Sequence, residues 1–462
     1  MLVSKKTAKN IALYSIANYL HTAINAVSNI FVSNILGPTY NGVISYYNAI
    51  NTNVDQVVFS TFRSSVERDV PQIEDVEQKF KYAQQAFVLN FISAVLFSLF
   101  FVIYGLQATD HVMSMSAYMM AVFNLVRCYS DFYRVWNKSL NKIPFPYPMV
   151  SIIMIITSLL IPVFAVLFSY LFSIKGFWIG RILLQAITLI CFLFVSKEFF
   201  RLCKPDFSVL KQIFVSGGEI VIFALFVSGI QTMDKYFVKG ALGLEALGYY
   251  AIGSMVFMML MLVPSSVTGA VYPRFVGMVH ENLKDKIKKY SIYIELLCVF
   301  VALIVYIIIP YLIEWFMPKY VNSIGVVRIL LIAFVSYASV QLRYIDIIRK
   351  KNMKQLITRA LVAFVIGLFC FIIVSRTDSD LSVYAWVTSL CFVLLGIGVN
   401  LAWGKTYDYH FGKRLYLILI ASFPAVCMIP IFVTSLNFLT AMSITVAICV
   451  VYYSIRIKLI KE

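Results

Sequence analysis

Long apolar stretches recur along the whole chain and are separated by short polar segments. A bilayer core of about 30 Å is crossed by roughly 20 residues of α-helix, and the apolar stretches have that length. The pattern therefore predicts about fourteen membrane-spanning helices, of which charged residues interrupt the fourth and the tenth. They lie near residues 10–36, 39–62, 84–106, 112–135, 146–171, 175–196, 213–237, 246–270, 290–311, 323–348, 355–375, 381–403, 414–434 and 437–456.

One short pattern occurs twice, at the ends of the first and the seventh predicted spans. Residues 31–42 and 237–248 share a Phe-Val pair, a Leu-Gly pair and a final Gly at one constant offset, 237 − 31 = 206 residues. Each copy joins two apolar stretches and so predicts a tight hairpin, where glycine accepts a positive φ and a close backbone approach. Chance similarity between apolar segments is the alternative. The repeat favours an internal duplication of the kind found in transporters.

A second, weaker repeat supports the duplication. An Asp-x-x-Arg-x-x-Asn pattern begins at Asp131 and again at Asp346, an offset of 346 − 131 = 215 residues. Six spans separate the two hairpins, so both halves keep one orientation and enclose a cavity around a pseudo-twofold axis along the membrane normal. The predicted domains are two six-helix bundles, 1–205 and 206–404, followed by two further spans in 405–462.

Composition agrees with a membrane protein. The chain is 61% hydrophobic and 13% charged, whereas soluble domains are roughly 45–50% apolar and 25% charged. The net charge of +17 comes from short basic patches between apolar stretches, which indicates membrane topology rather than nucleic-acid binding. Most basic residues fall on the side of the N-terminus, so both termini are expected in the cytoplasm. The first apolar segment lacks a signal-peptide cleavage site.

Four arginines lie inside predicted spans, where a charge is costly and usually faces a protein interior or a wet cavity. Guanidinium groups bind phosphate well because their planar donors engage oxygens in pairs. The alternative is that two of them form helix-internal pairs with Asp131 and Asp346, or extend to the cytoplasmic surface. The predicted cationic cavity for an anionic substrate is lined by Arg127, Arg181, Arg328 and Arg343.

Several carboxylates lie in or at the ends of spans and are candidates to bind a coupling H⁺ or Na⁺. The alternative is a carboxylate paired with a neighbouring cation or hydrated at the membrane rim, and Asp234 beside Lys235 has the form of such a pair. His21 is interpreted as a packing residue rather than a proton relay. No cofactor and no metal site are predicted, since the eight cysteines show no CxxC spacing. The coupling candidates are Asp55, Glu219, Asp234 and Glu295.

The chain carries no motif of an enzyme. A nucleophile elbow, a phosphate-binding loop and a zinc-binding motif are all missing from the sequence. The run Asp378-Ser379-Asp380 is of a type found in glycosyltransferases, but it falls in a short outward loop. The sequence therefore predicts a carrier rather than an enzyme.

The hairpin segments carry a family resemblance. Leu36-Gly37-Pro38-…-Gly42 and Asp234-Lys235-…-Leu242-Gly243-…-Leu247-Gly248-Tyr249-Tyr250 resemble the polysaccharide (O-antigen or capsule repeat-unit) flippases of the multidrug/oligosaccharidyl-lipid/polysaccharide exporter superfamily, which is MATE-like. The resemblance implies a bacterial inner-membrane protein that moves undecaprenyl-pyrophosphate-linked oligosaccharide outward by alternating access. It also implies association with a polysaccharide polymerase and glycosyltransferases. The two C-terminal spans depart from the family's usual twelve and are similar to those of peptidoglycan-precursor flippases.

Two other functions remain open at this point. A cation-coupled multidrug (MATE-type) antiporter would share the fold, but its cavity is expected to be acidic with few arginines. A membrane polysaccharide polymerase or ligase would carry catalytic residues in a long outward loop, and the sequence has no such loop.

Overall fold

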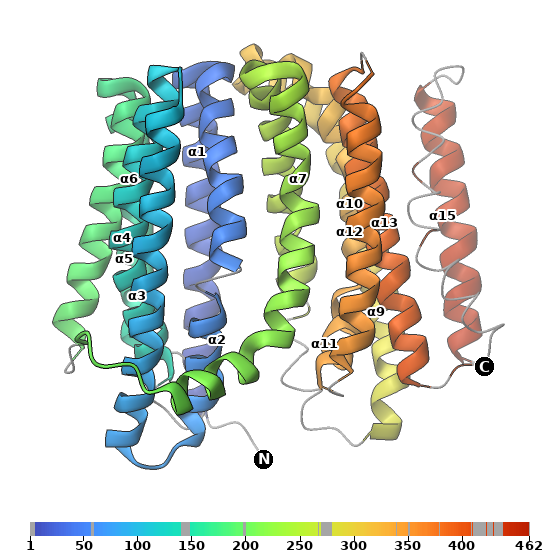
Figure 1. Ribbon diagram of the computed structural model, residues 1–462. Coiled ribbons are helices and arrows are strands. Elements are labelled where there is room, and N and C mark those ends of the chain that lie inside the picture. Colours follow the sequence, from blue (N-terminus) through green and yellow to red (C-terminus); the bar gives the residue numbers. More distant parts are fainter. Residues whose placement is uncertain are drawn as a thin grey trace. The chain divides into compact units, whose positions relative to one another are not determined.

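In the computed structural model, all elements of regular secondary structure in the described part of the chain are helices (Figure 1). That part comprises residues 5–56, 60–139, 148–196, 200–266, 268, 280–338, 340–349, 352–377, 379–407, 409, 422, 428 and 438–461. The helices are α1 (Lys5–Val54), α2 (Ser60–Asp69), η2 (Val70–Gln72), α3 (Val76–Gln107), α4 (His111–Ser139), α5 (Pro148–Ile161), η3 (Pro162–Leu167), α6 (Phe168–Val195), α7 (Phe207–Leu260), α9 (His280–Phe316), η4 (Pro318–Ser323), α10 (Ile324–Ala338), α11 (Gln341–Arg349), α12 (Met353–Val374), α13 (Leu381–Thr406) and α15 (Phe438–Lys461).

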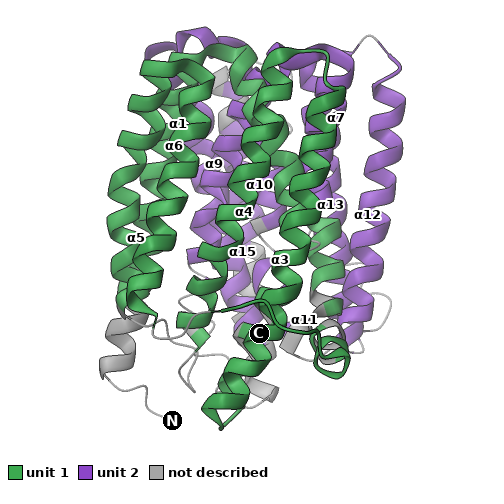
Figure 2. Ribbon diagram, turned by 60° about the vertical axis from the view of Figure 1, so that its left-hand side comes forward, with its two compact units in different colours: residues 1–228 green, residues 229–462 purple. Residues whose placement is uncertain are grey.

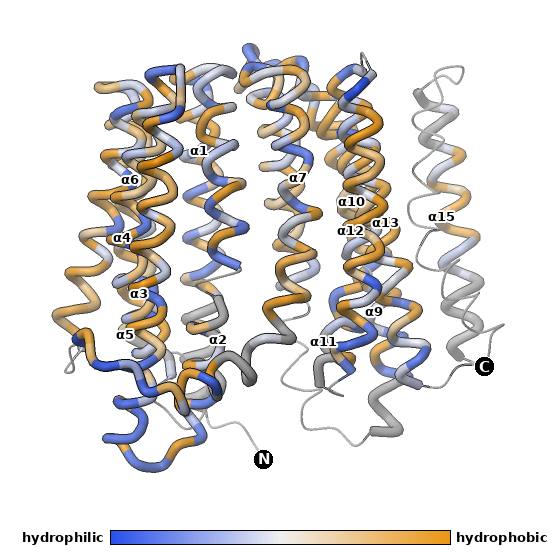
Figure 3. The backbone as a smooth tube through the Cα atoms, viewed as in Figure 1, coloured by the Kyte–Doolittle hydropathy of each residue, from blue (hydrophilic) through white to orange (hydrophobic). Residues whose placement is uncertain are grey.

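Seven helical stretches of the described chain are long and apolar enough to cross a membrane. They are Val76–Gln107, Met149–Val195, Val221–Ser266, Asp285–Phe316, Pro318–Tyr337, Met353–Val374 and Leu381–Thr406. Figure 3 shows hydrophobic residues along these helices and a hydrophilic segment between α2 and α3. The chain is therefore a multi-pass, all-helical membrane protein, as the hydrophobic pattern predicts. The predicted span 414–434 lies almost wholly outside the described residues, and the count of fourteen stays a prediction.

The two glycine hairpins have the same backbone conformation. Gly37 breaks α1 at φ 79°, ψ 174°, and Gly243 breaks α7 at φ 87°, ψ −176°. This region of φ/ψ space is open essentially to glycine alone. A Cβ added at either position would have no atom within 4 Å, so the backbone angle and not the space explains the glycine. The sequence repeat therefore marks a structural repeat, as predicted.

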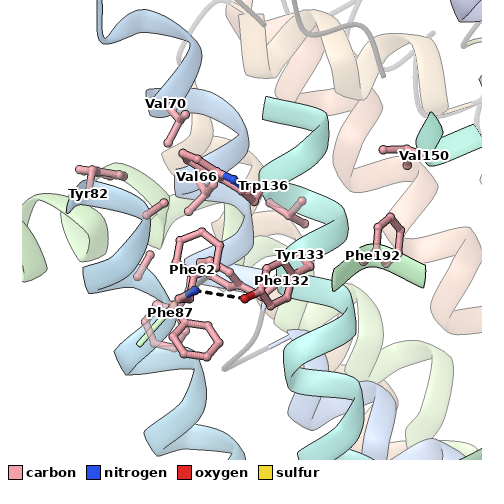
Figure 4. Close-up of a cluster of buried hydrophobic side chains, with 14 of the residues drawn as sticks. Phe62, Val66, Val70, Tyr82, Phe87, Phe132, Tyr133, Trp136, Val150 and Phe192 are labelled. Carbon is pink, nitrogen blue, oxygen red and sulfur yellow. Dashed lines mark hydrogen bonds between the residues drawn. The ribbon is translucent and has the colours of Figure 1, made fainter. Parts of the chain in front are cut away.

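The chain divides into two compact units, Met1–Ser228 and Gly229–Glu462 (Figure 2). In unit 1, α4 packs against α3 and α6, and α1 packs along α5. One end of this unit holds an aromatic cluster in which Phe87 lies 5.3 Å from Phe132 and 5.5 Å from Phe200, measured between ring centroids. The short helix α2 joins the cluster through Phe62 and Val66 (Figure 4). This packing fixes the residues of α2 against α3 and α4.

A second hairpin in unit 1 is unusually close-packed. The backbone turns at Ser173, which has φ 56°, ψ −142°. Beyond the turn, a Cβ on Gly176 would lie 1.8 Å from the carbonyl oxygen of Phe168, and one on Gly180 would lie 1.7 Å from that of Phe164. Contacts this short are impossible for a side chain, so the Gly-x-x-x-Gly spacing allows the two arms to approach backbone to backbone.

In unit 2, α13 packs against α10 and α12, α9 packs against α10, and α15 packs against α9. Large side chains fill its interior, among them Trp403, Tyr250 and Tyr384, each fully buried. The predicted boundaries of the bundles at 205 and 404 remain a prediction.

Three predicted spans differ in detail from the structure. The predicted helix 39–62 ends at Val54, and α2 follows separately from Ser60. The predicted helix 323–348 is two helices, α10 and α11. The second helix carries Arg343 and Asp346, whose side chains contact Glu295 on α9 and Trp403 on α13. Pro162 begins a π-helical turn, which suits a residue that has no N–H to donate.

Candidate functional site

An ion network in unit 1 joins three helices. The Asp55 carboxylate follows α1 and accepts hydrogen bonds from Arg63 Nη2 at 2.5 Å and from Arg127 Nη2. Asp131 Oδ2 accepts from Arg63 Nη1 at 2.8 Å and from Arg127 Nε at 3.1 Å. Asp131 Oδ1 lies 3.1 Å from Arg134 Nη2. Two carboxylates thus hold three guanidinium groups.

The helical period explains how α4 contributes to this network. Asn124, Arg127, Asp131 and Arg134 lie at i, i+3, i+7 and i+10, so they share one face of the helix. Arg127, Asp131 and Asp55 keep 14%, 16% and 24% of their side-chain surface exposed. The network is therefore shielded by protein but reachable by water and by polar groups.

Arg181 on α6 adds a further guanidinium group beside the network. Its Nη1 donates to Asn48 Oδ1 at 2.7 Å, and its guanidinium carbon lies 4.7 Å from the centroid of the Phe123 ring. The guanidinium carbon of Arg127 lies 6.0 Å from the same ring. Arg181 also lies beside the Trp178 ring at 5.6 Å. No carboxylate of the described residues forms an ion pair with Arg181, so Asn48 and the aromatic faces stabilise it.

Two buried amide side chains near these arginines have polar atoms without a hydrogen-bond partner in the described part of the chain. Asn124 is 1% exposed and Asn51 is 7% exposed. Neither the Oδ1 nor the Nδ2 atom of Asn124, nor the Oδ1 atom of Asn51, has a partner in the part of the chain that the structure describes. A buried amide without partners costs free energy, so these groups are suited to contact a polar ligand.

In unit 2, Arg343 is buried deeply. It is 1% exposed, its Nη1 donates to Asn400 Oδ1, and its Nη2 lies 3.8 Å from Glu295 Oε1. Asp346 is 2% exposed and accepts from Trp403 Nε1 at 2.9 Å and from the Tyr407 hydroxyl at 2.8 Å. These contacts tie α11 to α9 and α13, which supports a structural role for both residues.

The position of Arg343 has a neutral counterpart in unit 1. Residues 90 and 295 are separated by 295 − 90 = 205, and residues 128 and 343 by 343 − 128 = 215, close to or equal to the two offsets of the internal repeat. In unit 1 these positions hold Asn90 and Cys128, and Asn90 Nδ2 donates to Cys128 Sγ at 2.8 Å. Both polar pairs are buried. One copy of the repeat therefore carries an ionic pair where the other carries an uncharged one.

Arg328 lies on α10 and faces an aromatic ring. Its guanidinium carbon lies 4.5 Å from the centroid of Tyr306. The Nε atom is buried without a hydrogen-bond partner in the described part of the chain. Arg328 is therefore a half-buried cation with unused hydrogen-bonding capacity.

Asp234 on α7 is enclosed by hydroxyl groups of unit 2. It is 2% exposed, and its Oδ2 lies 3.3 Å from the Thr388 hydroxyl, which is 2.8 Å from the Tyr250 hydroxyl. The Lys235 backbone N–H donates to Asp234 Oδ1, while Lys235 Nζ points to the carbonyl of Gln231 at 3.4 Å. This arrangement differs from the simple interfacial pair of Asp234 with Lys235 that the sequence suggests as the alternative.

The structure brings some of the predicted site residues together. Arg127 meets Asp55, and Arg181 shares a ring with Arg127, all in unit 1; Arg343 meets Glu295 in unit 2. The side chain of Glu219 lies outside the described residues. His21 Nδ1 lies 2.9 Å from the Ser158 hydroxyl, as expected of a packing residue.

Sequence reasoning missed one member of the ion network. Arg63 counts as an ordinary basic residue of a cytoplasmic loop when the sequence is read alone. Its role follows from α2, whose apolar side packs into the aromatic cluster and turns Arg63 toward Asp55 and Asp131. The spacing of Asp55 and Arg63 along the sequence gives no indication of this contact.

Comparison with known proteins defines the class and then the family. The chain resembles the lipid II flippase MurJ in its inward closed conformation, with a TM-score of 0.67, 15% identity, and coverage of 98% of this chain and 100% of that one. It also resembles a MATE transporter crystallised with MaD3S, with a TM-score of 0.58, 16% identity, and coverage of 87% and 96%. The fold is therefore that of the MurJ and MATE membrane carriers. Residues 7–279 match the polysaccharide biosynthesis protein family, and the chain belongs to that family.

A curated relative is consistent with this assignment. The "Putative O-antigen transporter" of Shigella flexneri is 26% identical over 136 residues, which are 28% of this chain and 31% of the relative. The match thus spans about a third of that protein's length. The chain is thus a polysaccharide biosynthesis protein with the fold of the MurJ and MATE proteins.

Proposed function

We propose that this protein flips undecaprenyl-pyrophosphate-linked oligosaccharide repeat units from the cytoplasmic to the outer leaflet of a bacterial inner membrane, for O-antigen, capsule or exopolysaccharide biosynthesis. The family match and the MurJ-like fold support a lipid-linked oligosaccharide as the cargo. The observation that carries the proposal is the gathering of Arg127 and Arg181 on one aromatic ring, beside further arginines, inside a helical unit. The diphosphate is the anionic part of such a cargo, and arginine side chains bind it through charge-assisted hydrogen bonds.

The four predicted arginines have different environments, and the proposal ranks them accordingly. Arg127, Arg181 and Arg328 are partly exposed or have donors to spare, which suits contact with a substrate. Arg343 is enclosed by Glu295 and Asn400, so its proposed role is to hold α11 in place.

Among the coupling candidates, Asp234 is the residue that we propose as the site of a coupling H⁺ or Na⁺. It is buried, and its described oxygen contacts are hydroxyl and backbone groups rather than a cationic side chain. Asp55 is held by two arginines and Glu295 lies beside Arg343, which favours a structural counter-charge role for these two. A buried carboxylate among hydroxyl groups can take up a proton or a small cation without leaving a partner unpaired.

The proposal includes the topology of fourteen spans, with two six-helix bundles, two C-terminal helices and both termini in the cytoplasm. Green fluorescent protein fused after Glu462 folds and fluoresces only in the cytoplasm, so a fluorescent fusion is the expected result. A dark but membrane-inserted fusion would place the C-terminus outside the cytoplasm and contradict this topology. Association with a polymerase and glycosyltransferases stays a prediction of the family resemblance.

The test of function is transport in liposomes that contain the purified full-length protein and a fluorescent prenyl-diphosphate-linked oligosaccharide. We expect the cargo to cross the bilayer, as measured by its accessibility to an added glycosidase. Arg127→Ala and Arg181→Ala should each lower the rate at least about tenfold, because each removes a charged hydrogen-bond donor to phosphate. Arg201→Ala, which removes an exposed arginine of the same unit, is the matched control and should keep the rate.

The multidrug antiporter is the remaining alternative, because it shares the fold. It predicts proton- or sodium-driven movement of a cationic dye by the same liposomes, with no movement of the diphosphate cargo. That outcome would replace the flippase proposal.

A further inference from the structure

Two carboxylates of unit 1 each serve two arginines through a single oxygen atom. Asp55 Oδ1 accepts from Arg63 and from Arg127, and Asp131 Oδ2 accepts from the same two residues. Arg63 and Arg127 thus face one pair of acceptors from two different helices. An anion with more oxygen atoms would give each guanidinium group acceptors of its own.

Four guanidinium groups gather at these two carboxylates. Arg63, Arg127 and Arg134 contact Asp55 and Asp131, and a fourth arginine, Arg181, faces the ring that Arg127 also faces. A diphosphate has more acceptor oxygens and more negative charge than the corresponding monophosphate, so it can engage more of these groups at once.

Arg63 is placed for contact with a ligand and not only for packing. Its side chain keeps 13% of its surface exposed, close to the 14% of Arg127. The helix that carries it is anchored by Phe62 and Val66 in the aromatic cluster, so the guanidinium group is positioned before any ligand arrives. A phosphate and a carboxylate accept from guanidinium in the same bidentate geometry, so one can replace the other without rebuilding the site.

We propose that Arg63 is a further substrate-binding residue, which together with Arg127 and Arg181 takes the diphosphate of the cargo. Asp55 and Asp131 hold Arg63 and Arg127 in position while the site is empty of cargo, and the phosphate oxygens replace them when it binds. This inference rests on the proposed function, because it assumes a diphosphate-linked cargo. It adds the residue that sequence reasoning missed and assigns the two aspartates the role of exchangeable counter-anions.

The first experiment measures binding of farnesyl diphosphate and of farnesyl monophosphate to the full-length protein in nanodiscs of neutral lipid. We expect the diphosphate to bind more tightly than the monophosphate. Arg63→Ala should raise the Kd for the diphosphate about tenfold or more, which is the usual effect of losing a charged hydrogen bond. Arg201→Ala should leave the Kd unchanged. Equal affinity of the wild-type protein for both probes would overturn the match to a diphosphate.

A second measurement, the thermal stability of Arg63→Ala without ligand, separates a ligand contact from a structural ion pair. In this variant Arg127 still contacts Asp55 and Asp131, so neither carboxylate is left without a cation and the Tm should stay close to that of the wild type. If Arg63 touches the phosphate, the Kd for the diphosphate rises while the Tm is kept. If Arg63 only neutralises the carboxylates, the Tm falls while the Kd is unchanged, and that result overturns the proposal.

The outcomes also distinguish this inference from the proposed function. Weakened binding in Arg127→Ala and Arg181→Ala, with an unchanged Kd in Arg63→Ala, would refute the role of Arg63 and leave the flippase proposal intact. A wild-type protein that binds neither probe would refute both.

Discussion

The close-packed hairpin of unit 1 gives a prediction whose size follows from the coordinates. In Gly180→Ala, the new Cβ would lie 1.7 Å from the carbonyl oxygen of Phe164, whereas real Cβ contacts are essentially never under 3.0 Å. The two arms must therefore separate by more than 3.0 − 1.7 = 1.3 Å, which is enough to lose a large part of the dispersion energy between them. Overpacking of this kind costs about 1–3 kcal/mol, and the backbone partner, which cannot rotate away, puts the expected value at about 2–3 kcal/mol.

The assay is thermal unfolding of the purified protein in detergent, followed by circular dichroism. A change of 1 kcal/mol shifts Tm by roughly 2–4 °C in domains of 150–250 residues, so Gly180→Ala should lower Tm by roughly 4–12 °C. The control is Gly240→Ala on α7, where no atom lies within 4 Å of the added Cβ. There alanine should raise stability by about 0.5–1 kcal/mol, because glycine disfavours helix. Equal Tm values for the two variants would refute the argument from close approach.

Three further predictions follow from named contacts. Asp131→Asn removes a charge that faces three arginines. It should lower the free energy of unfolding, measured by the same melting experiment, by about 3 kcal/mol, which is the lower end of the range for breaking a buried ion pair. Gly37→Ala should cost about 1–3 kcal/mol because φ 79°, ψ 174° is a region for glycine; Gly37→Asn should be no better, and a milder effect of asparagine would contradict the assigned angles. Asp206 lies outside the spans and accepts from the Ser208 hydroxyl and N–H, and these bonds lower its pKa. Its stabilisation of the start of α7 should therefore be present above its ordinary pKa and be lost as the pH falls through the lowered value. Amide exchange at the start of α7 should be faster in Asp206→Ala than in the wild type near neutral pH, and the two should converge in strong acid.

The sequence predicted the parts of the fold that depend on local rules. The length of the apolar stretches predicts spans, and the repeated glycines between them predict two hairpins from the sequence alone. The positive φ of Gly37 and of Gly243 confirms that both turns need glycine. The break between α10 and α11 could not be read in this way. It depends on partners of Arg343 and Asp346 that lie on other helices, and tertiary contacts of this kind override a local apolar pattern.

The types of residue in the candidate site could be predicted from the sequence, but the contacts between them could not. Arg127 and Arg181 stand out because charges are rare inside spans, yet nothing along the chain shows that both would face Phe123. Arg63 was hidden because it falls in a predicted cytoplasmic loop, and its contacts depend on how α2 packs. The contribution of Arg63 to the site is therefore determined by tertiary packing and not by the local sequence pattern.

The two copies of the buried polar pair bear on how the halves diverged after duplication. The pair Asn90–Cys128 is neutral, and the pair Glu295–Arg343 is ionic. Changing a neutral pair into an ionic pair by single substitutions therefore passes through an intermediate with one unpaired buried charge. Such an intermediate is disfavoured by several kcal/mol, which makes the exchange a coupled event and each state hard to leave. A chimaera that copies one half of this protein onto the other would therefore have to transplant both members of the pair together.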